Sequence, residues 1–192
     1  LMPTGGGKSI CYQIPALELE GTAIVISPLI ALMKDQVDAL RINGISAAYF
    51  NSTLDNAEKA AVFSQLQSGE LQLLYLSPER LMSDQEYFLN ILKDEKISLF
   101  AIDEAHCISQ WGHDFRPAYR HISAHITEQK PQIFAFTATA TPEVQADIKE
   151  SLGITEAETY KGDLIRTNLA YVVRKTEDKL SATRNILDKV SG

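Results

Sequence analysis

The segment Pro3–Ser9 reads PTGGGKS and contains the residue types needed to hold a nucleoside triphosphate. Its glycines allow the backbone to wrap around a phosphate, with amide N–H groups directed inward at the positive end of a following helix. Lys8 would then reach the β and γ phosphates, and the Ser9 hydroxyl would ligate Mg²⁺. The strict pattern has glycine where this chain has Met2, so a glycine-rich turn with an incidental lysine is the alternative. The predicted phosphate site consists of Thr4, Gly5, Gly6, Gly7, Lys8 and Ser9.

A second group of chemically active residues, Asp103-Glu104-Ala105-His106, follows the apolar run Leu99–Ile102. An acid at the carboxyl end of a parallel strand lies at the ligand-binding edge of the sheet. Asp103 would hold Mg²⁺ opposite Ser9, Glu104 would orient or deprotonate the attacking water, and His106 would sense the γ-phosphate. An N-cap aspartate with a glutamate in the first helical turn is the alternative, but it leaves the phosphate site unexplained. Together the two motifs predict a nucleoside triphosphatase.

Two serines, Ser27 and Ser77, each stand between an apolar run and a Pro-initiated helical stretch. In each segment the hydroxyl and the first-turn amides could hold a phosphate of a single nucleic-acid strand. A role restricted to helix capping remains open for each serine.

The segment after His106 is rich in aromatic residues. Trp111, Phe115 and Tyr119 offer flat faces for base stacking, worth roughly 1–3 kcal/mol per base. Arg116 offers a phosphate contact, and His113 with the following aspartate could relay binding to the carboxylates upstream. The alternative is that Trp111 and Phe115 are core residues of a small subdomain, and a core position is open for Tyr119 as well.

The elements that must position these residues alternate along the chain. Buried β-strands are predicted at Thr22–Ile26, Ser46–Phe50, Gln72–Leu76, Ile97–Ile102 and Gln132–Phe136. Helical spacing is found at Ile30–Ile42, Asn56–Ser68, Asp84–Lys93 and Pro142–Leu152. Gly44, Gly69 and Gly153 fall where helix ends are expected. This alternation predicts an α/β fold with a doubly wound, mostly parallel sheet and helices on both faces.

From about Tyr160 the pattern changes. A turn at Gly162-Asp163, a strand at Asn168–Arg174 and a polar helix at 177–190 are predicted. We expect residues 1–160 to form the nucleotide-binding domain and residues 161–192 to form a linker strand and helix that lead to a further domain.

Composition excludes several classes of protein. The chain has 192 residues, enough for one α/β domain, and 45% of them are hydrophobic, which argues against disorder. No apolar run approaches the roughly 18 residues of a membrane span, so no membrane association is expected. Cys11 and Cys107 stand alone, which favours reduced thiols. The net charge of −7 argues against a surface coated for nucleic acid and leaves room only for a local binding track.

Two long segments carry a resemblance to a known family: DEAHCISQWGHDFRPAY at 103–119, and MPTGGGKSICYQIPAL at Met2–Leu17. Both resemble the RecQ family of DNA helicases, including the Met in place of the first glycine, and the resemblance extends to Arg166–Leu169. DEAH itself is similar to the superfamily 2 helicase signature. The TATAT segment resembles helicase motif III, whose hydroxyls, here Thr137 and Thr139, connect the carboxylates with the strand-binding face. A threonine before Pro142 is also an ordinary helix cap.

The resemblance implies a first RecA-like domain of an ATP- and Mg²⁺-dependent helicase that unwinds DNA with 3′-to-5′ polarity in repair and recombination. The family's strand before the phosphate loop, its adenine-reading glutamine motif and its second RecA-like domain are expected outside this chain. We therefore expect this chain alone to be monomeric, to hydrolyse ATP very slowly, and to bind single-stranded or partly duplex DNA without unwinding it. The expected location is the cytoplasm, at the nucleoid in bacteria, or the eukaryotic nucleus. The alternatives are a superfamily 2 RNA or ribonucleoprotein remodelling ATPase, and a module that holds nucleotide and single-stranded DNA without turnover.

Overall fold

The computed structural model describes residues 1–83, 95–112, 114–120, 122, 131–162, 172–173 and 175–188. The predicted helix Asp84–Lys93, the relay residue His113, the RTNL segment and most of the predicted strand Asn168–Arg174 lie outside the described residues.

Five parallel strands form one sheet in the order β2-β3-β1-β4-β5. Their bounds are Thr22–Ile26 (β1), Ala47–Phe50 (β2), Leu73–Leu76 (β3), Ile97–Ile102 (β4) and Gln132–Ala135 (β5). The five strands predicted between Thr22 and Phe136 are therefore confirmed, with bounds that differ by at most one residue. The register pairs Ile26 with both Leu76 and Ile102, so β1, β3 and β4 end level with one another.

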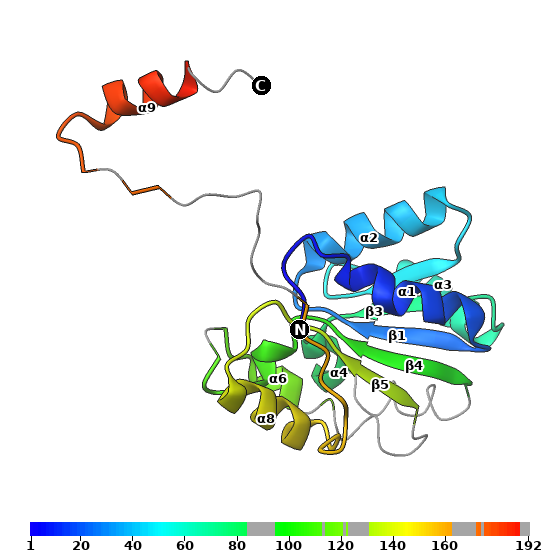
Figure 1. Cartoon of the computed structure of the whole chain (residues 1–192). Helices are drawn as coiled ribbons and strands as arrows, with labels where there is room; N and C mark the ends of the chain where they lie inside the picture. Colours follow the sequence, from blue (N-terminus) through cyan, green and yellow to red (C-terminus); the bar gives the residue numbers. More distant parts are fainter. Residues whose placement is uncertain are drawn as a thin grey trace.

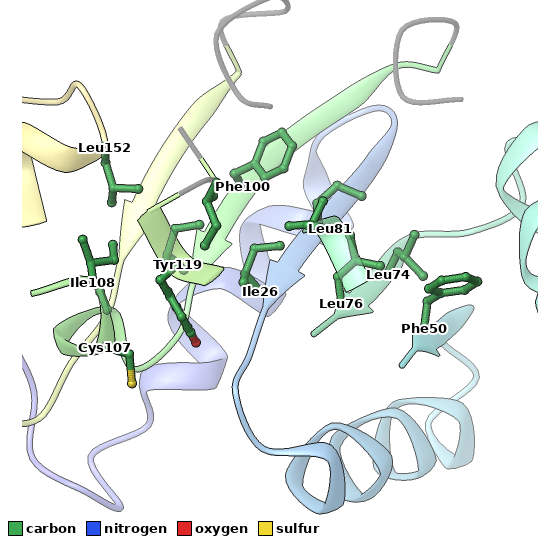
Figure 2. Packing of buried hydrophobic residues seen from close by; sticks show 14 of the residues in the cluster. Ile26, Phe50, Leu74, Leu76, Leu81, Phe100, Cys107, Ile108, Tyr119 and Leu152 are labelled. Atoms are coloured by element: carbon green, nitrogen blue, oxygen red, sulfur yellow. The ribbon is translucent and has the colours of Figure 1, made fainter. Parts of the chain in front are cut away.

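Helices cover both faces of the sheet, as the sequence predicts (Figure 1). On one face, α1 (Lys8–Glu18) and α2 (Ile30–Ile42) pack on Ala23, Val25 and their neighbours. On the other face lie α3 (Asn56–Gln67), α4 (Pro78–Ser83), α6 (Pro117–Arg120) and α8 (Pro142–Ser151). Figure 2 shows this second core, where Ile26, Leu76 and Phe100 pack together beneath the helices. Both faces are covered, so the strand sequences are continuously apolar rather than alternating.

Turns at the helix ends follow the predicted glycines. Gly44, Gly69 and Gly153 have φ values of 77°, 71° and 67°, in the left-handed region that ends α2, α3 and α8. Asp55 begins α3 with a capping box, because its side chain accepts from the Glu58 amide while Glu58 accepts from the Asp55 amide. These local signals set the residues at which the helices begin and end.

Strand β5 lies at one edge of the described sheet, and the chain that enters the glycine loop runs against this edge. The Met2 amide donates to the carbonyl oxygen of Thr137, just beyond β5, at 3.1 Å. A hollow of about 560 Å³ extends along β5 toward α8 and residues 154–160, with mainly apolar side chains lining it.

Helix α9 (Lys179–Leu187) lies within the predicted helix 177–190 and buries none of its side chains. The proposed domain boundary near residue 160 stays a prediction. None of the described helices combines the length and apolar character that crossing a membrane requires.

Candidate nucleotide site and aromatic loop

The glycine loop has a backbone that only glycine adopts without strain. Gly5 and Gly7 have φ values of 79° and 82°, and a Cβ on Gly6 would lie 2.9 Å from the Pro3 carbonyl oxygen. Helix α1 begins directly afterwards at Lys8, so its first amides face the loop. The loop therefore has the geometry of a phosphate cradle, with Lys8 and Ser9 on the first turn of the helix.

The two predicted motifs meet in one cavity of about 350 Å³ above the ends of β1 and β4. It brings Lys8 and Ser9 together with Asp103 and Glu104, although the two pairs are far apart in the chain. The hollow along β5 is larger, but it gathers none of these four residues, so we place the chemistry in the smaller cavity. The cavity is lined by Thr4, Gly5, Gly7, Lys8, Ser9, Tyr12, Ser27, Leu32, Met33, Gln36, Tyr75, Asp103 and Glu104.

Asp103 is a buried carboxylate, with 8% of its surface exposed. Burial raises its pKa above the ordinary value, and the neighbouring negative charge of Glu104 raises it further. The Glu104 amide, which donates to Asp103 at 3.0 Å, and the nearby Lys8 act in the opposite direction. A cation beside this carboxylate would stabilise its charged form. The Asp103 carboxylate and the Ser9 hydroxyl are both hard oxygen donors, the kind of ligand that Mg²⁺ prefers.

Glu104 has a strained backbone, with a φ of 47°, and it is the one non-glycine residue at positive φ among those described. Such a conformation costs on the order of 1–3 kcal/mol and persists only where the surroundings impose it. Here it turns the chain sharply from β4 into the short 3₁₀ helix η1 (Ala105–Ile108). After this turn Asp103 and Glu104 line the cavity, and the His106 side chain faces the loop that contains Thr137.

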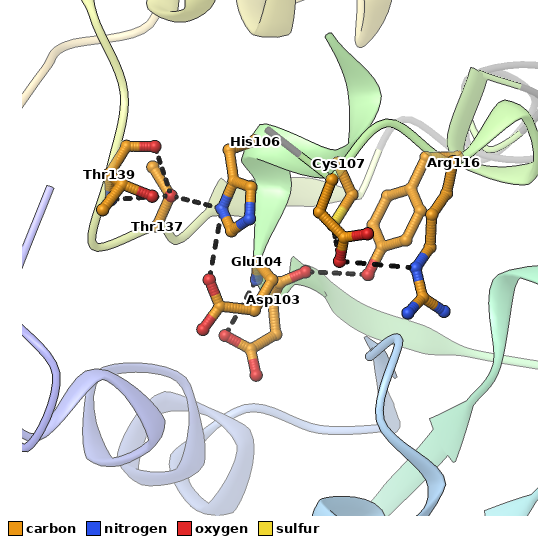
Figure 3. Close-up of polar contacts among 9 residues, drawn as sticks. Asp103, Glu104, His106, Cys107, Arg116, Thr137 and Thr139 are labelled. Atoms are coloured by element: carbon orange, nitrogen blue, oxygen red, sulfur yellow. Dashed lines mark hydrogen bonds and ion pairs between the residues drawn. The ribbon is translucent and has the colours of Figure 1, made fainter. Parts of the chain in front are cut away.

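His106 connects the carboxylates with the threonine segment (Figure 3). Its Nδ1 lies 2.9 Å from the Thr137 hydroxyl and 3.2 Å from a carboxylate oxygen of Glu104. The buried Thr137 hydroxyl also donates to the Thr139 carbonyl and accepts from the Thr139 amide, both at 3.2 Å. Both threonines were predicted to connect the carboxylates with the strand-binding face. In these contacts Thr137 takes part through its side-chain hydroxyl, whereas Thr139 takes part through its backbone.

The segment after η1 that carries Trp111 and Phe115, here called the aromatic loop, packs closely against η1 at Gly112. A Cβ at Gly112 would lie 2.5 Å from the His106 carbonyl oxygen, and the Gly112 amide donates to the Ser109 carbonyl at 3.0 Å. Directly beside this close contact, Trp111 leaves 80% of its surface exposed. The alternative that Trp111 is a core residue is therefore wrong, and its ring is available for stacking. Phe115 is half-buried, and the Arg120 guanidinium covers its ring at 5.4 Å from the centroid.

Arg116 and Tyr119 each connect segments that are distant in the chain around the site. Arg116, predicted as a phosphate contact, donates to the Pro28 carbonyl at 3.1 Å and lies 3.5 Å from a Glu79 carboxylate oxygen. It thus connects the aromatic loop with both Ser-Pro segments. Tyr119 is fully buried, so the core position that the sequence left open for it is confirmed and the stacking face is wrong. Its hydroxyl donates to the Asp103 carbonyl at 3.0 Å and so supports the carboxylate turn.

Sequence reasoning missed a buried polar network beneath the glycine loop. Gln13 Nε2 donates to Gln36 at 2.9 Å and to the Tyr75 hydroxyl at 3.1 Å, joining α1, α2 and β3. The Tyr75 hydroxyl in turn donates to the Tyr12 hydroxyl at 3.5 Å, and burial raises the pKa of Tyr12 far above its ordinary value. The signal was present in the CYQ triplet of α1, where two polar side chains occupy inward positions.

The fold and the cavity define a RecA-like P-loop nucleotide-binding domain. The chain belongs to the DEAD/DEAH box helicase family, whose family model matches residues 1–148. Its relatives include the ATP-dependent DNA helicase RecQ of Bacillus subtilis (strain 168), which is 57% identical over 181 residues. RecQ of Pasteurella multocida (strain Pm70) is 49% identical over 175 residues, and the ATP-dependent helicase SGS1 of Saccharomyces cerevisiae is 42% identical over 184. These similarities confirm the resemblance to the RecQ family.

The matches cover most of this chain but a minor part of each relative. They span 93%, 90% and 91% of the chain, and 30%, 27% and 13% of the respective relatives. Among solved structures, the Hef helicase domain of Pyrococcus furiosus matches with a TM-score of 0.62 at 18% identity, covering 80% of this chain and 33% of that one. That similarity supports the fold alone.

Proposed function

We propose that this chain is the ATP-binding half of a RecQ-like, ATP-dependent 3′-to-5′ DNA helicase, which couples ATP hydrolysis to translocation on single-stranded DNA and to duplex unwinding in repair and recombination. The observation that carries the proposal is a continuous path of contacts from the phosphate cavity to an exposed aromatic ring. It runs from Glu104 to His106, then from the His106 carbonyl to the Ser109 amide, and from the Ser109 carbonyl to the amide of Gly112, the residue next to Trp111.

Each cavity residue has a role in this proposal. Lys8 binds the β and γ phosphates of ATP, and Ser9 with Asp103 holds Mg²⁺, which when bound neutralises charge on the phosphates. Glu104 orients the attacking water and takes its proton. His106 reports the state of the γ-phosphate to Thr137 through their shared hydrogen bond, and Thr139 follows through its backbone.

The nucleic-acid partner in this proposal is single-stranded or partly duplex DNA. Trp111 stacks on a base, and Phe115, His113 and Ser77 complete the track. Arg116 contributes by holding the loop against the Ser-Pro segments rather than by a free phosphate contact. Residues 161–192 lead to a second RecA-like domain, which supplies an arginine finger worth roughly 10³–10⁵ in rate. The expected location is the cytoplasm, at the nucleoid or in the nucleus.

A Lys8→Ala variant tests the assignment of the two sites. Nucleotide binding should be lost, because the charge that faces the phosphates is removed, while affinity for single-stranded DNA should stay within twofold of the parent chain. Binding is measured with a fluorescent ATP analogue and with labelled single-stranded DNA and RNA of the same sequence. Equal loss of nucleotide and DNA binding would mean that the two sites are misassigned. Preference for RNA would favour the RNA-remodelling alternative.

A further inference from the structure

Ser27 occupies an unusual position at the end of β1. The register that pairs Ile26 with both Leu76 and Ile102 brings the next residue of each strand to the same edge, so Ser27 lies between Ser77 and Asp103. The Asp103 amide donates to the Ile26 carbonyl at 2.8 Å, which fixes this neighbourhood. Ser27 is thus held beside the carboxylate proposed to hold Mg²⁺.

The Ser27 side chain is buried without a partner. It is 2% exposed, and its hydroxyl oxygen has no hydrogen-bond partner among the described residues. A buried hydroxyl in this condition costs free energy, so it persists where a ligand satisfies it. Ser27 lines the nucleotide cavity, together with Ser9, Lys8 and Asp103. The missing partner therefore belongs in that cavity.

We infer that the Ser27 hydroxyl is part of the metal–phosphate site, where it hydrogen-bonds an oxygen of the bound Mg²⁺–nucleotide, either a water held by the metal or a phosphate oxygen. The sequence had placed Ser27 on the nucleic-acid track. The cavity that Ser27 lines is the one that gathers Lys8, Ser9 and Asp103, and the Asp103 carboxylate would repel a phosphodiester that carries no metal. The inference rests on the nucleotide binding proposed above and assigns a further positioning residue to it.

Ser77 provides a matched control. It has the same strand–Ser–Pro context, follows the neighbouring strand β3 and is equally buried, with 3% exposed. Ser77 does not line the nucleotide cavity. Its strand β3 lies between β2 and β1, whereas the strand of Ser27, β1, lies between β3 and β4, which carries Asp103 at its end. Replacing either serine by alanine removes one buried hydroxyl from a strand end, but only one of the two changes the nucleotide site.

The experiment compares Ser27→Ala and Ser77→Ala in this chain with a methylanthraniloyl-labelled ADP, in Mg²⁺ and in EDTA, and with labelled single-stranded DNA. Loss of one hydrogen bond predicts that Ser27→Ala weakens Mg²⁺–nucleotide binding about three- to tenfold. Ser77→Ala should instead weaken binding of single-stranded DNA, as its proposed place on the DNA track requires, without a selective loss of Mg²⁺–nucleotide affinity. Ser27→Ala should lower nucleotide affinity and leave DNA affinity unchanged. A loss confined to Mg²⁺ identifies a metal-held water as the partner, and an equal loss in EDTA identifies a phosphate oxygen.

Thermal melting of the ligand-free variants separates positioning from folding. Because the Ser27 hydroxyl is unsatisfied in the free chain, Ser27→Ala should melt no lower than the parent while binding nucleotide less well. The inference is overturned if Ser27→Ala leaves nucleotide affinity unchanged, or if it lowers DNA affinity instead. Failure of the parent chain itself to bind the labelled ADP in Mg²⁺ would overturn the proposed function, and this inference with it.

Discussion

Replacing Thr137 by valine removes the hydroxyl that joins the carboxylate turn to the threonine segment while preserving the shape of the side chain. That hydroxyl is 6% exposed and contacts His106 Nδ1 at 2.9 Å and the backbone of Thr139 at 3.2 Å. Thr139 is exposed, so its backbone groups can form hydrogen bonds with water instead. The main free-energy cost therefore comes from the buried His106 Nδ1, which loses its hydrogen bond to Thr137. We expect a loss of about 1–2 kcal/mol in the free energy of unfolding. For a chain of this length that corresponds to a fall of roughly 2–8 °C in melting temperature.

The matched control is Thr139→Val, because the Thr139 side chain is exposed and only its backbone takes part in the contacts. Thr139→Val should change the free energy of unfolding by less than about 0.5 kcal/mol. Urea unfolding of both variants, with His106→Ala and the double variant His106→Ala/Thr137→Val, gives the coupling energy between the two side chains, expected to be about 1 kcal/mol. Equal effects of the two valine substitutions, or a coupling energy near zero, would refute the connection between the DEAH turn and the threonine segment.

Three further variants test the site. Asp103→Asn should raise the melting temperature of the ligand-free chain at pH values above the pKa of Asp103, where the parent carries a buried negative charge. Burial raises the pKa of Asp103, so the folded state binds its proton more tightly and the parent loses stability as pH rises through that pKa. The same variant should abolish Mg²⁺-dependent stabilisation by nucleotide in a thermal shift assay, and an undiminished shift would remove Asp103 from the metal site. Gly112→Ala places a methyl group 2.5 Å from the His106 carbonyl, which should cost about 1–3 kcal/mol of stability by urea unfolding; an unchanged midpoint would mean that the loop is not docked. Trp111→Ala should leave stability within about 0.5 kcal/mol, because the ring is exposed, yet weaken single-stranded DNA binding about five- to a hundredfold in anisotropy titrations. Unaltered DNA affinity would make Trp111 irrelevant to the track.

The sheet and its helices could be predicted from the sequence because their signals are local. The β-branched run of β1 and the glycine that ends α2 each depend on a few neighbouring residues, and the structure places both as expected. The meeting of the glycine loop with Asp103 was also predictable, since the carboxyl ends of parallel strands share one edge of the sheet.

Individual side-chain partners could not be predicted, because they come from distant segments. Arg116 bonds to Pro28, and Arg120 covers Phe115, arrangements that no periodicity encodes. Ser27 and Ser77 look alike in sequence, and only the strand order, which puts β4 beside β1, separates their surroundings. Tyr119 looked like a stacking residue because it stands in an aromatic-rich run, but its place on α6 turns it toward the core.

The central claim is that the nucleotide cavity and a DNA-binding loop are coupled, and Trp111 reports on it directly because it is the one tryptophan of the chain. The most direct measurement is its intrinsic fluorescence during titration with short single-stranded DNA, with and without Mg²⁺ and a non-hydrolysable ATP analogue. We expect a saturable change in fluorescence that weakens with salt and whose midpoint shifts when nucleotide is bound. No change on adding DNA, in folded protein that binds nucleotide, would contradict the claim, as would a DNA response that is indifferent to nucleotide.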